Sequence, residues 1–197
     1  MADKPTLILA STSPYRRELL LRLGLVFHTV APGVDEAPRE GEAPAARAAR
    51  LARAKAEAVA SDEPAAVVIG SDQVASCSTA TGLTILDKPL TAERSRAQLA
   101  AMSGREVHFD TAVTVLWPGG GADHVDLTRV VLRDLSATAI DRYLARESAL
   151  DCAGGFKAEG LGITLMKRIE SQDPTGLIGL PLIWLGEALR RAGLDLP

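Results

Sequence analysis

The first residues with the potential for chemistry lie in the segment STSPYRR, residues 11–17, which follows a short apolar run. Ser13 is suited to cap a helix beginning at Pro14, because serine is a preferred N-cap and proline fits the first helical position. The N–H groups of such a helix start, the hydroxyls of Ser11 and Ser13 and the Arg16 guanidinium would form an anion site. The alternative is a simple cap with solvated arginines, although two arginines here oppose the helix dipole.

Two acidic positions could serve a metal ion or a water molecule. Asp72 follows the apolar run AAVVIG, residues 65–70, and is either a turn former or a cleft carboxylate. Asp35 and Glu36 form a second acidic cluster in an earlier loop rich in proline and glycine. Neither position indicates a function by itself.

Two of the few lysines stand where a cation could assist these groups. Leu51, Lys55 and Val59 are spaced four residues apart, so Lys55 lies on the apolar stripe of a predicted helix. Its side chain either snorkels to solvent or points into a polar cleft. Lys88 precedes another predicted helix and by itself would be interpreted as a loop residue. Hydroxyls, arginine, lysines and carboxylates together suit a metal-bound polyphosphate, whose hydrolysis needs neutralised phosphates and an activated water.

Several other chemistries are disfavoured. The sequence contains no GxxxxGK[ST], GxSxG or HExxH motif, and His28, His108 and His124 are scattered. Cys77 and Cys152 form no CxxC pair, which argues against a zinc site or a disulfide framework.

Short apolar runs and helical patterns alternate along the chain, which favours an α/β fold. Strands are expected at 6–10, 26–30, 65–70, 108–117 and 125–132, and helices from Pro14 to Gly24, at 45–60, at 91–102, after Ser136 and from Pro181. Thr91 and Ser136 are suited to cap their helices. No linker separates independent domains, so residues 1–197 are expected to form one domain.

Composition and charge exclude several classes of protein and of partner. Of the 197 residues, 47% are hydrophobic, which is enough to build a core and excludes a disordered chain. The net charge of −3 argues against a nucleic-acid partner. No apolar run reaches the length of a membrane span, and the N-terminus lacks a secretory pattern, so we expect a cytoplasmic protein with no membrane partner.

Six ordered motifs resemble the Maf family of nucleoside triphosphate pyrophosphatases: LILASTSPYRRELL, VDE, LARAKAEAVA, GSDQV, DKPL followed by LAAMSG, and CAGGFKAEGLG. The resemblance runs from Leu7 to about Leu189. It implies a curved mixed β-sheet in two lobes around a nucleotide cleft, as in inosine triphosphatases, and a homodimer.

The resemblance also implies roles for individual residues. Phosphate binding would involve five side chains: Ser11, Ser13, Arg16, Lys55 and Lys88. Glu36 and Asp72 would serve a divalent cation (Mg, Mn or Co) and the attacking water, with Asp72 as proton acceptor. Spacing alone does not decide which carboxylate is the base and which is the metal ligand. The substrate would be a nucleoside triphosphate, cleaved to a monophosphate and pyrophosphate.

Three positions resemble the branch of this family that hydrolyses 7-methyl-GTP: Tyr15, Gln73 and Glu159. An aromatic face at Tyr15 can attract the positive charge of N7-methylated guanine, and the Glu159 carboxylate can accept hydrogen bonds from the guanine edge. Tyr15 departs from the tryptophan common in that branch but is still aromatic. The alternatives are a pyrophosphatase for another nucleotide, such as dTTP or UTP, and a nucleotide-binding regulator of cell division.

Overall fold

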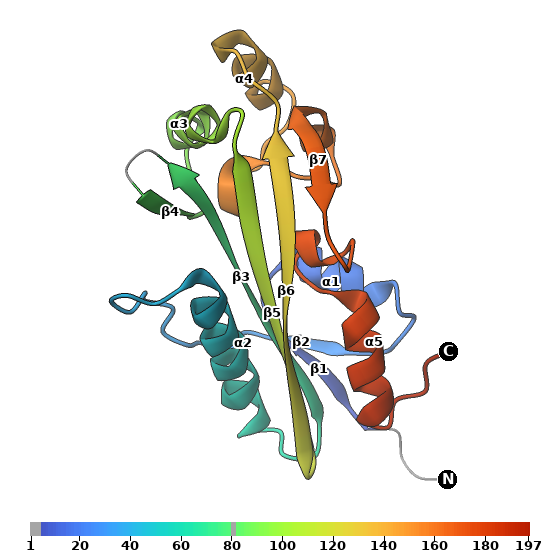
Figure 1. Cartoon of the computed structure of the whole chain (residues 1–197). Coiled ribbons are helices and arrows are strands. Elements are labelled where there is room, and N and C mark those ends of the chain that lie inside the picture. Colours follow the sequence, from blue (N-terminus) through green and yellow to red (C-terminus); the bar gives the residue numbers. More distant parts are fainter. Residues whose placement is uncertain (1–4, 80–81) are drawn as a thin grey trace. The chain divides into compact units, whose positions relative to one another are not determined.

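The computed structural model describes residues 5–79 and 82–197 (Figure 1). The chain divides into two compact units. Unit 1 consists of Met1–Asp72, Thr111–Asp126 and Asp173–Pro197, and unit 2 consists of Gln73–Asp110 and Leu127–Gln172. Each unit is described by itself below.

Unit 1 contains strands β1 (Leu7–Ala10) and β2 (His28–Val30) and the adjoining parts of three longer strands. The longer strands contribute residues to both units: β3 (Val67–Thr79), β5 (Glu106–Trp117) and β6 (Gly120–Leu132). The strand order is β2-β1-β3-β5-β6, and β1 is parallel to both of its neighbours. The helices of this unit are α1 (Pro14–Leu21), α2 (Pro44–Ala60), η3 (Gly176–Ile178) and α5 (Leu182–Arg191).

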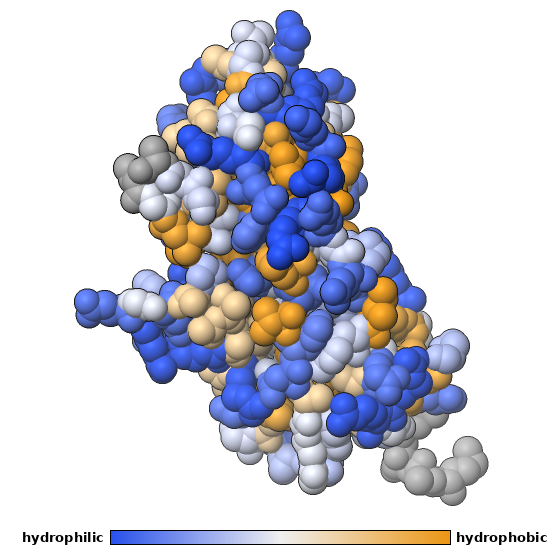
Figure 2. Space-filling view, viewed as in Figure 1, coloured by the Kyte–Doolittle hydropathy of each residue, from blue (hydrophilic) through white to orange (hydrophobic). Residues whose placement is uncertain are grey.

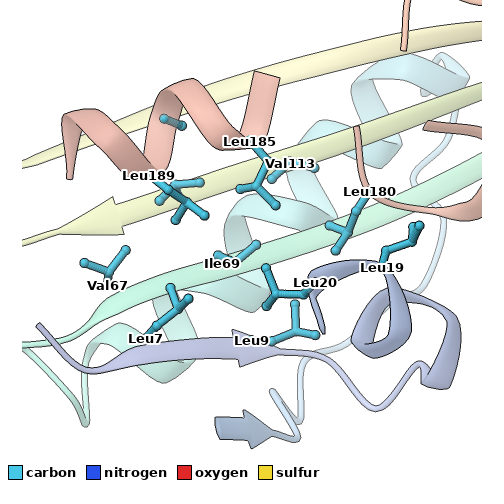
Figure 3. Close-up of a cluster of buried hydrophobic side chains, with 12 residues drawn as sticks. Leu7, Leu9, Leu19, Leu20, Val67, Ile69, Val113, Leu180, Leu185 and Leu189 are labelled. Carbon is cyan, nitrogen blue, oxygen red and sulfur yellow. The ribbon is translucent and has the colours of Figure 1, made fainter. Parts of the chain in front are cut away.

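Both faces of the unit 1 sheet are buried, which explains the continuous apolar runs of β1 and β3. On one face, Leu7 and Leu9 pack with Leu19 of α1 and Leu185 of α5 (Figure 3). On the opposite face, Ile8 packs with buried residues of β3 and α2. Helices therefore cover this sheet on two sides and hold its strands rigidly.

Unit 2 has the strand order β4-β3-β5-β6-β7. Its edge strands β4 (Gly82–Leu86) and β7 (Met166–Glu170) are antiparallel to β3 and β6, respectively. The other elements are the helices α3 (Ala92–Met102) and α4 (Ala137–Leu144) and the short 3-10 turns η1 (Ala153–Gly155) and η2 (Leu161–Leu165). The chain thus has a mixed sheet, and the predicted α/β class is confirmed.

The predicted caps are confirmed: the Oγ atoms of Ser13 and Ser136 and the Oγ1 atom of Thr91 each accept a hydrogen bond from a backbone N–H three residues later. The predicted end of the third strand is wrong. The strand does not stop at Gly70 but continues as β3 to Thr79, and β7 was not predicted at all. Polar residues can lie inside the buried part of β3 because partners from other segments satisfy them, as described below.

Hydrophilic residues cover most of the face seen in Figure 2, with hydrophobic residues in small separate groups. Among the described residues, no helix has the length and apolarity that crossing a membrane requires.

Candidate active site

The structure places the ten predicted site residues in both units. Seven belong to unit 1: Ser11, Ser13, Tyr15, Arg16, Glu36, Lys55 and Asp72. Unit 2 contains the other three, Gln73, Lys88 and Glu159. The charged residues of unit 1 form the centre of the candidate site.

Lys55 lies between two carboxylates in unit 1. Its Nζ atom is 2.7 Å from Asp72 Oδ1 and 2.7 Å from Glu36 Oε1. The side chains of Lys55 and Asp72 are 7% and 11% exposed, whereas that of Glu36 is 54% exposed. The snorkelling interpretation of Lys55 is therefore wrong. A buried ammonium requires such pairing, because desolvation without a partner is costly.

Close packing of α2 on β3 places Lys55 within reach of Asp72. A Cβ atom on Gly70 would collide with the carbonyl oxygen of Ala52 and lie 2.6 Å from the backbone nitrogen of Ala56. Only glycine permits this approach, and the alanines of α2 add little bulk. The sequence GSD therefore combines a contact point for the helix with the carboxylate two residues later.

The segment after β1 folds into a tight turn leading into α1. The backbone N–H of Ser13 donates to Ser11 Oγ at 3.1 Å, and Ser13 Oγ accepts the N–H of Arg16 at 3.4 Å. Ser13 is thus an ordinary N-cap, and Ser11 is buried. Tyr15 is half-buried in the first turn of α1. Phosphate binding by the two serines stays a prediction.

The Arg16 guanidinium is anchored to a distant carbonyl group. Its Nε atom donates to the carbonyl oxygen of Gly179 at 3.2 Å, and Ser71 Oγ donates to the same oxygen at 2.9 Å. Burial lowers the pKa of Arg16, while the negative charges of Asp72 and Glu36 act in the opposite direction. Arginine remains protonated at neutral pH. The centre therefore contains two cations and two carboxylates within electrostatic range of one another.

The loop before α5 holds the Gly179 carbonyl in place. Asp173 Oδ1 accepts the N–H and the hydroxyl of Thr175, at 3.0 and 2.6 Å, and its Oδ2 accepts the N–H of Ile183 at 2.6 Å. Asp173 is buried. One carboxylate thus ties the start of the loop to the first turn of α5. Gly179 itself has φ of 129° and ψ of 0°, a conformation that favours glycine.

Gly179→Ala is expected to destabilise the protein by about 1–3 kcal/mol, because a side chain is strained at this backbone conformation. The new Cβ would also lie 3.3 Å from Arg16 Cγ and press on the anchored arginine. Chemical denaturation measures the free energy of unfolding. Gly186→Ala is the control: this glycine lies within α5, where the new Cβ would meet only Arg190 Nη1, at 3.9 Å, and alanine should stabilise by roughly 0.5–1 kcal/mol. Equal effects of the two substitutions would contradict the prediction.

A second network fixes the loop that contains Glu36. Arg50 binds both Glu42 carboxylate oxygens, at 2.6 and 2.7 Å, and donates to the carbonyl oxygen of Ala37 at 3.2 Å. The hydrogen bonds from Arg50 lower the pKa of Glu42 to about 2. Asp35 Oδ1 accepts the N–H of Ala37 at 2.9 Å. Both neighbours of Glu36 in the sequence are therefore held, although Glu36 lies in a loop.

The predicted residues of unit 2 lie in two loops and at the beginning of the unit. Gln73 is the first residue of unit 2 and continues β3 directly after Asp72. Lys88 is exposed in the loop after β4. The carbonyl oxygen of its neighbour Asp87 accepts a hydrogen bond from Gln98 Nε2 at 2.9 Å. Glu159 is exposed in the glycine-rich segment between η1 and η2.

The donor set fits a metal ion that binds together with phosphate. Within residues 5–79 and 82–197, no group of three or more His, Cys, Asp or Glu side chains could hold an ion alone. The Glu36 and Asp72 carboxylates nevertheless lie near one another, because each is 2.7 Å from Lys55 Nζ. Mg²⁺ is commonly bound by one or two carboxylates, and substrate phosphates and water molecules complete its coordination.

Sequence reasoning missed Ser71 and Gly179. Ser71 could have been found, because it precedes Asp72 in the same motif and shares its burial. Gly179 had no local signal that links it to Arg16, since 163 positions separate the two residues.

Comparison with known proteins finds matches by family model, by sequence and by structure. Residues 6–192 match the family model described as "Maf-like protein". A protein of Xanthomonas oryzae pv. oryzae named 7-methyl-GTP pyrophosphatase is 57% identical over 193 residues, covering 98% of this chain and 100% of the relative. Proteins of the same name from Bordetella avium and Pseudomonas syringae pv. tomato are 52% and 48% identical, covering 99% and 98% of this chain and 97% and 100% of the relatives. The Staphylococcus aureus Ham1 protein matches with a TM-score of 0.43 and 14% identity, over 66% of this chain and 72% of that chain.

Proposed function

The chain belongs to the Maf family, and on this premise we propose that it hydrolyses 7-methyl-GTP to the nucleoside monophosphate and pyrophosphate. The observation that carries the proposal is the arrangement of Lys55 between Asp72 and Glu36, with Arg16 within electrostatic range. Cations that neutralise a triphosphate and a carboxylate that accepts a proton from water are the groups that this hydrolysis needs. The relatives of the same name support 7-methyl-GTP as the substrate.

Asp72 is proposed as the acceptor of the water proton. It is buried and held on a strand, whereas Glu36 is exposed and lies in a loop. In this step the oxygen of water forms a bond to phosphorus in the anhydride between the α and β phosphates. The anhydride bond breaks, pyrophosphate leaves with the electron pair, and the Asp72 carboxylate takes the proton. A rigid base loses little of its effect to reorientation.

Lys55 and Arg16 are proposed to neutralise the phosphates. Both cations are oriented before the substrate enters, Lys55 by two carboxylates and Arg16 by the Gly179 carbonyl. Such preorganised charges stabilise the charge that develops on phosphate oxygens in the transition state. Ser11, Ser13 and Lys88 are further phosphate ligands in this proposal.

Glu36 and Asp72 are proposed to hold a divalent cation, Mg, Mn or Co, together with phosphate oxygens. When bound, the cation supplies charge neutralisation and a water of lowered pKa. The identity of the cation and the homodimer implied by the family resemblance stay predictions.

Base recognition is assigned to Tyr15, Gln73 and Glu159. Tyr15 offers an aromatic face to the methylated ring, whose positive charge favours such contact. The exposed carboxylate of Glu159 can accept hydrogen bonds from both donors of the guanine edge. UTP has neither the fixed positive charge nor that pair of donors.

Glu159→Gln is expected to lower the ratio of kcat/KM for 7-methyl-GTP to that for UTP about tenfold. The amide keeps one acceptor but loses the charge, and a hydrogen bond to a charged group contributes about 1.5–3 kcal/mol. The control is Glu170→Gln, which replaces an exposed glutamate of β7 that pairs with Arg168 in the same unit. An unchanged ratio in Glu159→Gln would mean that this carboxylate does not contact the base.

Pyrophosphate release from 7-methyl-GTP, GTP and UTP in the presence of Mg²⁺ tests the proposed substrate. We expect the highest kcat/KM for 7-methyl-GTP. A preference for UTP would assign the chain to a different nucleotide, and binding of all three without turnover would indicate a regulator instead of an enzyme.

A further inference from the structure

A carboxylate outside the candidate active site binds the backbone of the glycine-rich segment. Glu147 follows α4 and is half-buried. Its Oε1 accepts the N–H of Leu161 at 2.9 Å, and its Oε2 accepts the N–H of Gly162 at 3.0 Å. Tyr143 Oη donates to the same Oε2 at 3.0 Å. Glu147 thus clamps one end of the segment that contains Glu159.

Tyr143 holds the other end. Its buried hydroxyl accepts the backbone N–H of Lys157 at 3.3 Å while donating to Glu147. The carbonyl oxygen of Lys157 accepts the N–H of Gly160 at 3.3 Å, which closes a turn with Ala158 and Glu159 at its centre. The two residues near the end of α4 therefore fix both sides of the turn that presents Glu159.

The glycines of the segment leave room for this clamp. A Cβ atom on Gly160 would collide with Glu147 Oε1, and one on Gly162 would collide with the carbonyl oxygen of Lys157. Larger residues would push the segment off the carboxylate or open the turn. The approach of Glu147 thus explains Gly160, and the close approach of the Lys157 backbone explains Gly162.

The clamp depends on a carboxylate at this position. Two backbone N–H groups and a phenol donate to Glu147, so both of its oxygens are needed as acceptors. A glutamine would present an NH₂ group to one of these donors. Burial, and then the hydrogen bond to Glu147, raise the pKa of Tyr143, so the phenol stays protonated and keeps its role as donor.

We propose that Glu147 and Tyr143 are positioning residues for nucleotide discrimination, acting through the backbone of residues 157–162 on the placement of Glu159. The proposal rests on the proposed function, in which Glu159 contacts the base. It assigns the two residues no contact with the substrate. Their effect therefore belongs to the choice between nucleotides and not to the hydrolytic step.

The test compares Glu147→Gln with Asp141→Asn. Asp141 lies in α4, six residues before Glu147, and pairs with Arg96 at 2.7 Å, so its variant controls for the loss of an acid in this region. Two quantities are measured: hydrogen exchange at the amides of Leu161 and Gly162, and the ratio of kcat/KM for 7-methyl-GTP to that for UTP. For Glu147→Gln we expect exchange at both amides to accelerate tenfold or more and the ratio to fall about tenfold, with both quantities unchanged in Asp141→Asn.

The ratio separates positioning from a general loss of stability, because destabilisation lowers the rates for both nucleotides alike. An unchanged ratio in Glu147→Gln would overturn the proposal, whether or not exchange accelerates. Should Glu147→Gln fail to fold, Tyr143→Phe removes the hydroxyl that links both ends, and the same criteria apply. A wild type that does not prefer 7-methyl-GTP would refute the proposed function, whereas a wild type with that preference and a variant that retains it would refute the positioning role alone.

Discussion

Asp72→Asn is expected to lower kcat by about 10²–10⁴-fold while the protein remains folded, because the amide cannot accept the water proton. The substitution keeps the shape of the side chain, and Lys55 retains Glu36 as an ionic partner at 2.7 Å. The loss should therefore appear in kcat for 7-methyl-GTP much more than in KM. Steady-state pyrophosphate release and the melting temperature, measured on the same preparation, check both parts of the prediction.

Asp123→Asn is the matched control for this variant. Asp123 is also an acid of unit 1, but it pairs with Arg53 and accepts from Thr114 Oγ1 at 2.7 Å, outside the candidate site. Its kcat should stay close to that of the wild type. Near-normal turnover in a folded Asp72→Asn protein would remove Asp72 from the reaction and, with it, the proposed mechanism.

Lys55→Ala is expected to lower kcat/KM by about 10²–10³-fold, since it removes a preorganised cation from the phosphate site. The substitution also leaves the largely buried Asp72 carboxylate without its ammonium partner, which destabilises the fold. Lys55→Arg keeps the charge and should restore part of the activity. Both kcat/KM and the free energy of unfolding need to be measured to separate the two effects.

Lys167→Ala, which removes an exposed lysine of β7, is the control for loss of a positive charge. It should leave kcat/KM and stability near wild-type values. If Lys55→Ala lowered stability but kept the wild-type kcat/KM, Lys55 would have a structural role only, and the phosphate site would have to lie elsewhere.

Local signals made the start of α1 and the position of Lys55 predictable. A cap is formed between residues three positions apart, so Ser13 and Pro14 contain the whole signal for the helix start. The apolar stripe of α2 likewise placed Lys55 on the buried face, although it left open whether the ammonium would snorkel. That the Lys55 ammonium is buried and paired with Asp72 and Glu36 could be learned only from the folded structure.

Long-range contacts and strand lengths were not predictable from the sequence. The carbonyl oxygen of Gly179 accepts hydrogen bonds from Arg16 and Ser71, which are each more than one hundred residues away in the sequence. No local sequence pattern predicts such a contact. The extension of β3 through Asp72 was missed for a related reason. A buried polar residue inside a strand depends on partners that the fold supplies.

Product analysis with 7-methyl-GTP tests the central claim most directly. Incubation of the wild type with Mg²⁺ should yield 7-methyl-GMP and pyrophosphate in equal amounts, and Asp72→Asn should yield almost none of either product. Release of inorganic phosphate with 7-methyl-GDP, or equal product formation by the Asp72→Asn protein, would contradict a pyrophosphatase centre built on Asp72, Lys55 and Glu36.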